Sequence, residues 1–270
     1  MTDPFLIRDH VADYPRYAPI YAERSAATRK ALRQIRDIPY GHGAGETLDL
    51  YFPAPEDGVK RPIHLFIHGG YWRAHSKDDY AFVADTVTAA GAIAAIVDYS
   101  LMPGARMAVL IDEVRGAAAW LRDNAGSFGG NPERFTASGH SAGGHLTAML
   151  AASGASGLAA AMPVSGMFDL KPLTKSFLQA EISLSDDEVE KFSPVNLPGD
   201  ASVSYVLVAG AAETAPFRDQ AQDYATHLAL AGIKPRTIMV PGEDHMSIIL
   251  SLGTPGSETA NLLTELISDH

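Results

Sequence analysis

The sequence predicts an α/β fold around a mostly parallel sheet, because short apolar runs typical of strands alternate with helix-forming stretches along most of the chain. The clearest strand is at residues 63–67, which is short and mainly apolar, as expected for a strand covered on both faces. Alternating strands and helices imply parallel pairing with right-handed crossovers. The chain has 270 residues, 46% of them hydrophobic, which is enough for one large domain. We therefore expect a single α/β domain over residues 1–270.

Each expected element has its own sequence signal. The stretch at 22–36 mixes Ala, Arg and Lys and favours a helix, and strands at 35–40 and 47–52 flank a glycine-rich turn. The remaining strands are expected at 63–67, 92–97, 135–138, 159–164, 203–209 and 236–240. The remaining helices are expected at 81–90, 109–124, 145–152 and 220–231, with the last one inside 246–267.

One segment interrupts this alternation. Residues 167–198 lie between two expected strands, are irregular and contain Phe168, Phe177 and Phe192. In parallel sheets, functional sites lie where the strands end at their carboxyl edge. We interpret the segment as a small cap inserted over such a site.

The composition narrows the classes of function. A net charge of −11 and a pI near 5.3 argue against a nucleic-acid partner and against an anionic membrane surface, since both require a basic face. The N-terminus has no apolar run typical of a signal peptide, and no stretch is long enough to span a bilayer, so we expect a soluble, cytoplasmic protein. There is no cysteine, which excludes a cysteine nucleophile and thiolate metal sites. Ten histidines are present without an H-E-x-x-H spacing, so neither a metal nor another cofactor is expected.

The strongest motif is Gly139-His140-Ser141-Ala142-Gly143, which matches the nucleophile-elbow pattern G-x-S-x-G. In an elbow, a strand turns sharply into a helix and exposes a serine hydroxyl, and only small residues fit two positions to either side. A chance match in a glycine-rich chain is the alternative. The expected strand before the motif and the helix-like run after it favour Ser141 as a nucleophile.

A second motif, His68-Gly69-Gly70-Tyr71-Trp72, follows the strand at 63–67. An oxyanion hole needs backbone N–H groups that approach the developing negative charge closely, and glycines permit that approach. We predict that Gly69 and Gly70 supply such groups, together with the N–H of Ala142 at the start of a helix. An ordinary Gly-Gly turn is the alternative. Tyr71 and Trp72 are expected to form one wall of the substrate pocket.

The base and acid should follow the last strands, in the chain order serine, acid, histidine. His245 follows the strand at 236–240 and is the predicted base. Glu213 is the only carboxylate between the strand at 203–209 and the next helix, and it is the predicted acid, with Asp169 in reserve. Phe168 of the cap is a predicted pocket residue, although the cap aromatics could equally pack beneath a loop.

The HGGYW and GHSAGG motifs resemble those of the kynurenine formamidases, or arylformamidases, which neighbour the hormone-sensitive-lipase-like esterases of the α/β-hydrolase superfamily. The resemblance extends over residues 38–249 and includes Asp98-Tyr99-Ser100-Leu101 and the segments at 128–134, 165–170 and 193–194. It implies an α/β-hydrolase fold and hydrolysis of N-formylkynurenine to formate and an aromatic amine. It carries the nucleophile to Ser141, the base to His245, and the oxyanion donors to Gly69, Gly70 and Ala142. The chain departs from the family at the acid, where Glu213-Thr214-Ala215-Pro216 replaces Asp followed by Ser and Pro.

These observations predict a cofactor-independent serine hydrolase that cleaves an ester or amide bond of a small, aromatic substrate through an acyl-enzyme. A general short-chain carboxylesterase and a non-catalytic ligand-binding homologue are the alternatives, and a metallohydrolase is a third class. The sequence predicts a small-molecule partner and makes no prediction about the oligomeric state.

Overall fold

The computed structural model describes residues 2–55, 57–154 and 156–270, and within them eight strands form one sheet in the order β1-β2-β4-β3-β5-β6-β7-β8. β2 pairs antiparallel with both β1 and β4, and every other neighbouring pair is parallel. The prediction of a mostly parallel α/β sheet is therefore confirmed. The strands are β1 (Arg33–Pro39), β2 (Thr47–Phe52), β3 (Arg61–Ile67), β4 (Ile93–Val97), β5 (Gly130–His140), β6 (Ala160–Val164), β7 (Ser204–Gly210) and β8 (Arg236–Val240).

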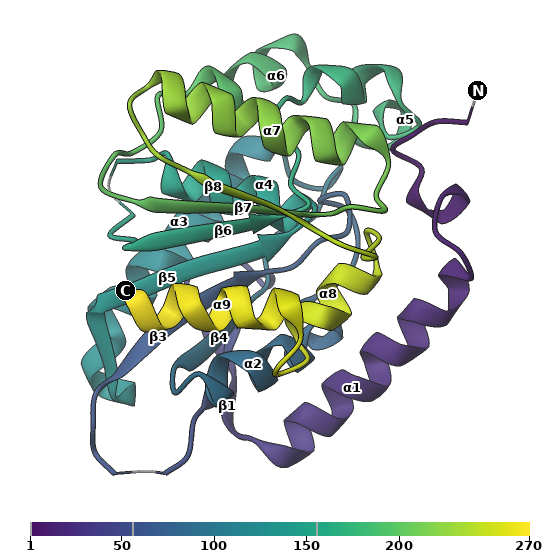
Figure 1. Cartoon of the computed structure of the whole chain (residues 1–270). Helices are drawn as coiled ribbons and strands as arrows, with labels where there is room; N and C mark the ends of the chain where they lie inside the picture. Colours follow the sequence, from purple (N-terminus) through teal and green to yellow (C-terminus); the bar gives the residue numbers. More distant parts are fainter. Residues whose placement is uncertain (1, 56, 155) are drawn as a thin grey trace.

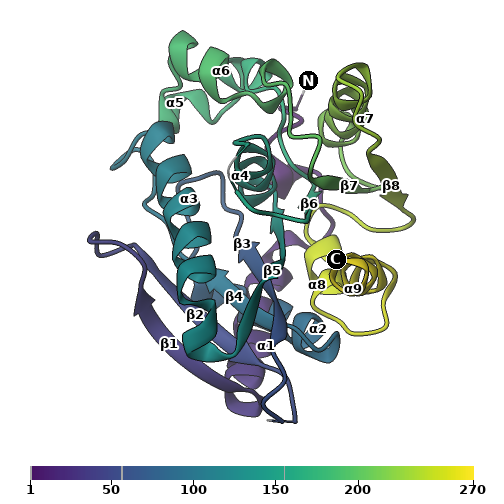
Figure 2. The ribbon, with the colours of Figure 1, turned by 90° about the vertical axis from the view of Figure 1, so that its left-hand side faces the viewer.

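Helices cover both faces of the sheet. α1, α2, α8 and α9 lie on one face, and α3, α4 and α7 lie on the other (Figures 1 and 2). The central strands β3 to β6 are consequently buried on both sides, which explains their nearly continuous apolar sequences. The α-helices are α1 (Tyr17–Ala31), α2 (Ala84–Ala89), α3 (Met107–Asn124), α4 (Ala142–Ala151), α5 (Gln179–Ile182), α6 (Asp186–Phe192), α7 (Ala215–Leu230), α8 (Ser247–Leu252) and α9 (Glu258–Asp269).

The first helix differs from its prediction at both ends. The sequence predicted a helix over 22–36, whereas α1 spans Tyr17–Ala31 and β1 begins at Arg33. The helix ends because Leu32 is extended and the following residues pair with β2, with Arg33 opposite Phe52. Sheet pairing thus overrides the helix propensity of this stretch.

The inserted segment 167–198 contains the short helices α5 and α6 and two 3₁₀ turns, Lys171–Lys175 and Pro194–Asn196. It is attached to the start of α3, because Arg106 pairs with Glu188 and donates to the Ile182 carbonyl oxygen (2.9 Å). In the residues that the structure describes, no helix has the length and apolar character needed to cross a membrane.

Candidate active site

Ser141 occupies the turn between β5 and α4 in a backbone conformation that L-residues rarely adopt (φ 57°, ψ −116°). Its neighbours must be small, since a Cβ on Gly143 would lie 2.0 Å from the Ile67 carbonyl oxygen, and one on Gly139 would lie 2.3 Å from that of Gly143. The Ser141 N–H donates to Val164 of the adjacent strand (2.9 Å). The sharp turn therefore places the hydroxyl at the carboxyl edge of the sheet, as an elbow requires.

Glu213 and His245 form a buried pair at the same edge of the sheet. His245 Nδ1 lies 2.7 Å from Glu213 Oε2, and the two side chains are 5% and 0% exposed. The other carboxylate oxygen, Oε1, accepts from the Ser165 hydroxyl and from the Gly210 N–H, both at 2.6 Å. A carboxylate oxygen accepts hydrogen bonds, so the contact with Glu213 Oε2 places the imidazole proton on Nδ1.

A cavity of about 150 Å³ brings Ser141 and His245 together. No hydrogen bond joins their side chains in the described part of the chain, and such bonds often form only when substrate is bound. Asp169, the reserve acid, is outside this cavity and accepts instead from the Lys171 N–H (2.9 Å). The lining residues are Ile7, Tyr14, Gly70, Tyr71, Arg73, Ala74, His75, Tyr80, His140, Ser141, His245 and Met246.

The loop after β3 packs directly on the elbow. A Cβ on Gly69 would lie 2.9 Å from the His140 carbonyl oxygen, and Gly70 has φ +114° with the Ala74 carbonyl oxygen 2.2 Å from where its Cβ would be. Both positions therefore require glycine. The N–H groups of Gly69, Gly70 and Ala142 have no protein acceptor among the described residues. Three backbone donors without a protein acceptor thus lie in the elbow and in the loop packed on it, where the oxyanion hole was predicted.

His68 holds this loop from behind. Its ring stacks on Tyr99 at 4.4 Å, and its Nδ1 lies 2.8 Å from the Gly69 carbonyl oxygen. Burial lowers the pKa of His68 to about 4, so the ring is neutral, and a carbonyl acceptor requires the proton on Nδ1. The hydroxyl of Tyr99 donates to the His68 carbonyl oxygen (2.9 Å). The Gly69 peptide is therefore fixed on both sides.

His140, the residue before Ser141, contacts the predicted base. Its Nε2 lies 2.9 Å from the His245 carbonyl oxygen, and the two rings are 4.7 Å apart. Desolvation by burial holds the pKa of His140 well below its usual range, so the neutral ring donates through Nε2 and fixes the main chain of His245.

Of the three aromatic residues predicted to bind substrate, one lines the cavity and two are in the core. Tyr71 lines the cavity, but Trp72 and Phe168 do not, and they are 0% and 1% exposed. Tyr71 and Trp72 both have positive φ (54° and 59°), and this bend sends Trp72 beneath the loop, where its Nε1 donates to His145 (3.2 Å). Phe168 stacks on Tyr224 of α7 at 4.6 Å. The prediction that these two residues bind substrate is therefore corrected to a core position for each.

The cap contributes to the cavity only indirectly, through residues that line it. No described residue of 167–198 lines the cavity, although Phe177 packs edge-on against Tyr71 and Glu181 pairs with Arg73 (2.5 Å). Ile7 and Tyr14, from the N-terminal segment, occupy the wall expected for the cap. The sequence does not reveal their position, because nothing local distinguishes them from other apolar residues. Ser165, by contrast, directly follows β6, and its place at a strand end was a signal that could have identified it.

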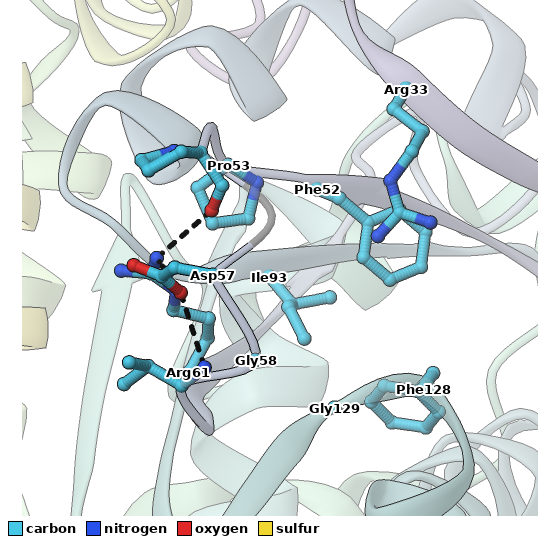
Figure 3. Close-up of a pocket in the computed structure, with 11 residues that line it drawn as sticks. Arg33, Phe52, Pro53, Asp57, Gly58, Arg61, Ile93, Phe128 and Gly129 are labelled. Carbon is cyan, nitrogen blue, oxygen red and sulfur yellow. Dashed lines mark hydrogen bonds and ion pairs between the residues drawn. The ribbon is translucent and has the colours of Figure 1, made fainter.

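A second cavity of about 290 Å³ lies at the opposite end of the sheet (Figure 3). It is bordered by the beginning of β3 and β4, with the Arg33 guanidinium 3.8 Å above the Phe52 ring and Arg61 paired to Asp57. It contains none of the predicted site residues. Among the described residues, no three His, Asp or Glu side chains are grouped so that they could hold a metal ion.

The sheet order, the strained serine turn after β5 and the carboxylate–imidazole pair after β7 and β8 define an α/β-hydrolase. Comparison with known proteins agrees: residues 111–265 match the prolyl oligopeptidase family model, and residues 48–165 match the BD-FAE model. A Pyrobaculum calidifontis esterase has the same fold, with a TM-score of 0.73 at 18% identity over 95% of this chain and 93% of that one.

The chain is also similar to kynurenine formamidases over most of its length. The Danio rerio enzyme is 30% identical over 250 residues, which covers 88% of this chain and 84% of that protein. The Salmo salar enzyme is 28% identical over 91% of this chain and 86% of that protein. This hydrolase therefore belongs to the kynurenine formamidase family.

Proposed function

We propose that this enzyme hydrolyses a small N-formyl anilide, such as N-formylkynurenine, by acyl transfer to Ser141. The observation that carries the proposal is the 2.7 Å contact between Glu213 and His245, because His245 lines the same cavity as Ser141. This combination supplies the three functions of a serine hydrolase, namely nucleophile, base and orienting acid. The kynurenine formamidase relatives support the choice of substrate.

In the first step, Ser141 Oγ attacks the formyl carbon and His245 Nε2 takes the hydroxyl proton. Nε2 carries the lone pair because Nδ1 donates its hydrogen to Glu213, whose carboxylate also stabilises the imidazolium. The carbonyl oxygen becomes an oxyanion, and the free N–H groups of Gly69, Gly70 and Ala142 stabilise its charge. Loss of one such donor typically lowers kcat by about 10²- to 10³-fold.

In the second step, the imidazolium gives its proton to the anilide nitrogen as the C–N bond breaks, which leaves formyl-Ser141 and a free aromatic amine. Water then attacks the formyl ester while His245 takes one of its protons. Formate leaves, and the proton returns to Ser141. His245 thus acts first as base and then as acid in each half of the reaction.

The cavity favours a substrate with a small acyl group and with a carboxylate on its amine part. At about 150 Å³ it has room for a formyl group and part of an aromatic ring. Arg73 lines the cavity and could hold the substrate carboxylate, although its Nε already pairs with Glu181. Lys171 and Lys175, two cations of the segment 167–198, are exposed and are not in the cavity lining.

Substrate panels test this proposal. We expect kcat/KM to fall steeply from formyl to butyryl amides, since one methylene in a tight pocket is worth roughly 10- to 200-fold. N-formylkynurenine should also outcompete uncharged formanilide.

The Arg73→Gln variant should raise KM for N-formylkynurenine by roughly tenfold or more through loss of a charge-assisted hydrogen bond, while the KM for formanilide stays unchanged. Lys171→Gln is the matched control. Good turnover of butyryl esters with none of the formyl amide would instead establish a short-chain carboxylesterase.

A further inference from the structure

The N-terminal segment, residues 3–16, lies across the predicted active site. Ile7 and Tyr14 line the same cavity as Ser141 and His245, although they are more than 120 residues away from Ser141 in the chain. Figure 1 shows the segment running from beside the start of α7 to α1. Ile7 is buried and Tyr14 is half-buried. The segment therefore closes one side of the cavity with one apolar and one aromatic side chain.

Tyr71 connects this segment to the loop after β3. Its hydroxyl donates to the Phe5 carbonyl oxygen (2.7 Å) and accepts from the Ile7 N–H (3.3 Å), so one side chain holds two backbone groups of the segment. Tyr71 directly follows Gly70, which also lines the cavity. The positive φ of Tyr71 (54°) turns its ring toward the N-terminal segment. These hydrogen bonds fix the position of the segment relative to the loop that contains Gly69 and Gly70.

Further contacts fix the segment to the surroundings of the acid and the base. The Phe5 ring packs edge-on against Phe217 at 6.0 Å, and Phe217 lies 4.3 Å from the His245 ring. Thr214, next to Glu213, donates to the Pro4 carbonyl oxygen (2.8 Å). From the cap, the Phe177 N–H donates to Asp3 Oδ2 (2.6 Å). The segment thus contacts three separate parts of the site but belongs to none of the strands that build it.

We infer that residues 3–16 form a wall of the active site that limits the size of the substrate. Ile7 and Tyr14 are its specificity-determining residues, and Tyr71 is the positioning residue that holds it. The inference rests on the proposed function, because it takes the cavity around Ser141 as the place of reaction. It assigns substrate selection to a segment that supplies none of the predicted catalytic groups.

Selectivity measurements on aryl esters test the role of the wall. The kcat/KM values of p-nitrophenyl acetate, butyrate and hexanoate are compared, together with alkyl acetates from ethyl to hexyl. Ile7→Ala and Tyr14→Ala should raise the ratio of long to short substrates by roughly tenfold or more in at least one series, since room for added methylenes is worth that much. Leu6→Ala, in the same segment but outside the cavity lining, is the matched control and should keep the wild-type ratios.

Hydrogen exchange tests the role of Tyr71 without any turnover. Tyr71→Phe removes both hydrogen bonds and keeps the ring, so amide exchange over residues 5–16 should accelerate by roughly tenfold or more as local opening becomes easier. In kinetics, KM should rise more than kcat falls, with the size ratio relaxed. Tyr205→Phe is the control, because this hydroxyl also accepts a backbone N–H (Asp200, 3.1 Å) but lies outside the cavity lining.

The possible results distinguish the inference about residues 3–16 from the proposed function. Folded and active Ile7→Ala and Tyr14→Ala enzymes with wild-type size ratios would overturn the inference and leave the proposed function intact. Unchanged exchange over residues 5–16 in Tyr71→Phe would overturn the role of Tyr71. A wild-type enzyme that hydrolyses neither amides nor esters would overturn both the proposed function and the inference.

Discussion

Glu213 reaches the His245 imidazole with one carboxylate oxygen, while its other oxygen accepts from Ser165 and from the Gly210 N–H. These donors explain how a Glu can act at the position where the resemblance to the family predicts an Asp. The extra methylene is accommodated because the carboxylate is held from two other directions. Its orientation therefore depends on β6 and β7 as well as on its own side chain.

Glu213→Gln should keep the fold and lower kcat by about 10⁴-fold, because the amide favours the wrong imidazole tautomer. Steady-state kinetics and a thermal melt on the same sample provide the measurement. Asp169→Asn is the matched control, since Asp169 lies outside the cavity lining. A large loss of activity in Asp169→Asn, with Glu213→Gln nearly unaffected, would move the acid to Asp169.

The contrast between Glu213 and Trp72 shows what could be predicted at this scale. Chain order and strand ends were sufficient to bring Ser141, Glu213 and His245 to one edge of the sheet, because the carboxyl ends of parallel strands converge there. They could not predict the direction of Trp72. That direction depends on two successive positive φ angles in the loop after β3, which have no signature in a non-glycine sequence.

At the scale of elements, the loop after β3 is decisive, because the proposed mechanism takes two of its oxyanion donors from this loop. Gly70 has φ +114°, and a Cβ there would lie 2.2 Å from the Ala74 carbonyl oxygen. Gly70→Ala should therefore displace the loop and lower kcat by about 10²- to 10³-fold with a smaller effect on KM, as loss of an oxyanion donor does.

Gly58→Ala is a fitting control for that substitution. Gly58 also has a positive φ (+75°), but no atom lies within 4 Å of its would-be Cβ, and it is outside the catalytic cavity. Both variants change the backbone preference of a glycine, and only one touches the site. Equal activity in the two variants would show that the loop does not supply a donor.

Element boundaries were less predictable than element types. The Ala-, Arg- and Lys-rich stretch has helix propensity beyond Ala31, but Arg33 and the residues after it pair with β2. The start of α7 shows the opposite error, because the helix begins at Ala215, five residues before the predicted 220, with Pro216 in its first turn. The end of α1 is thus set by pairing with a strand distant in sequence, and the start of α7 by the extended backbone of Thr214 followed by Pro216.

At the scale of the whole molecule, five histidines are buried among the residues that the structure describes, and burial lowers the pKa of four of them enough to keep them neutral. Burial lowers the pKa of His64 to about 3 and the pKa values of His68 and His145 to about 4, and it holds the pKa of His140 well below its usual range. His64 and His145 lie inside the fold, with hydrogen bonds to neutral partners such as Thr136 and the Phe192 carbonyl. Each pKa is lower in the folded protein than in the unfolded chain, where it is about 6.5.

The sign of the pH effect follows from this difference. Above about pH 6.5, neither state protonates these rings and their full contribution to stability is present. As the pH falls toward 4, the unfolded chain binds protons that the folded protein does not, so the free energy of unfolding drops by about 1.4 kcal/mol per pH unit for each histidine. The loss ends once the pH has passed below the folded pKa values.

Urea unfolding at several pH values between 7 and 4.5 measures this slope. His64→Gln should reduce the slope by about one proton relative to the wild type. His42→Gln, a substitution at an exposed position, should keep the wild-type slope and controls for the loss of a histidine as such. An unchanged slope in His64→Gln would contradict the buried neutral state of this ring.

The long-range closure of the site was the least predictable feature of the molecule. Ile7 and Tyr14 line the cavity, and their segment contacts distant parts of the chain: the Ile7 N–H donates to Tyr71, and the Phe5 ring packs against Phe217. No local period or motif in the N-terminal segment signals these contacts. The sequence instead favoured the cap, because its aromatic residues stand between two strand ends, and the structure uses them for packing.

The central claim is that Ser141 carries the acyl group, and acid-quenched turnover followed by peptide mass analysis tests it most directly. Wild-type enzyme incubated with N-formylkynurenine should show a formyl adduct on the peptide that contains Ser141. Ser141→Ala should show no adduct and a kcat lowered by about 10⁶-fold, with substrate binding retained. Full turnover by a folded Ser141→Ala enzyme, or an adduct on another residue, would contradict the account.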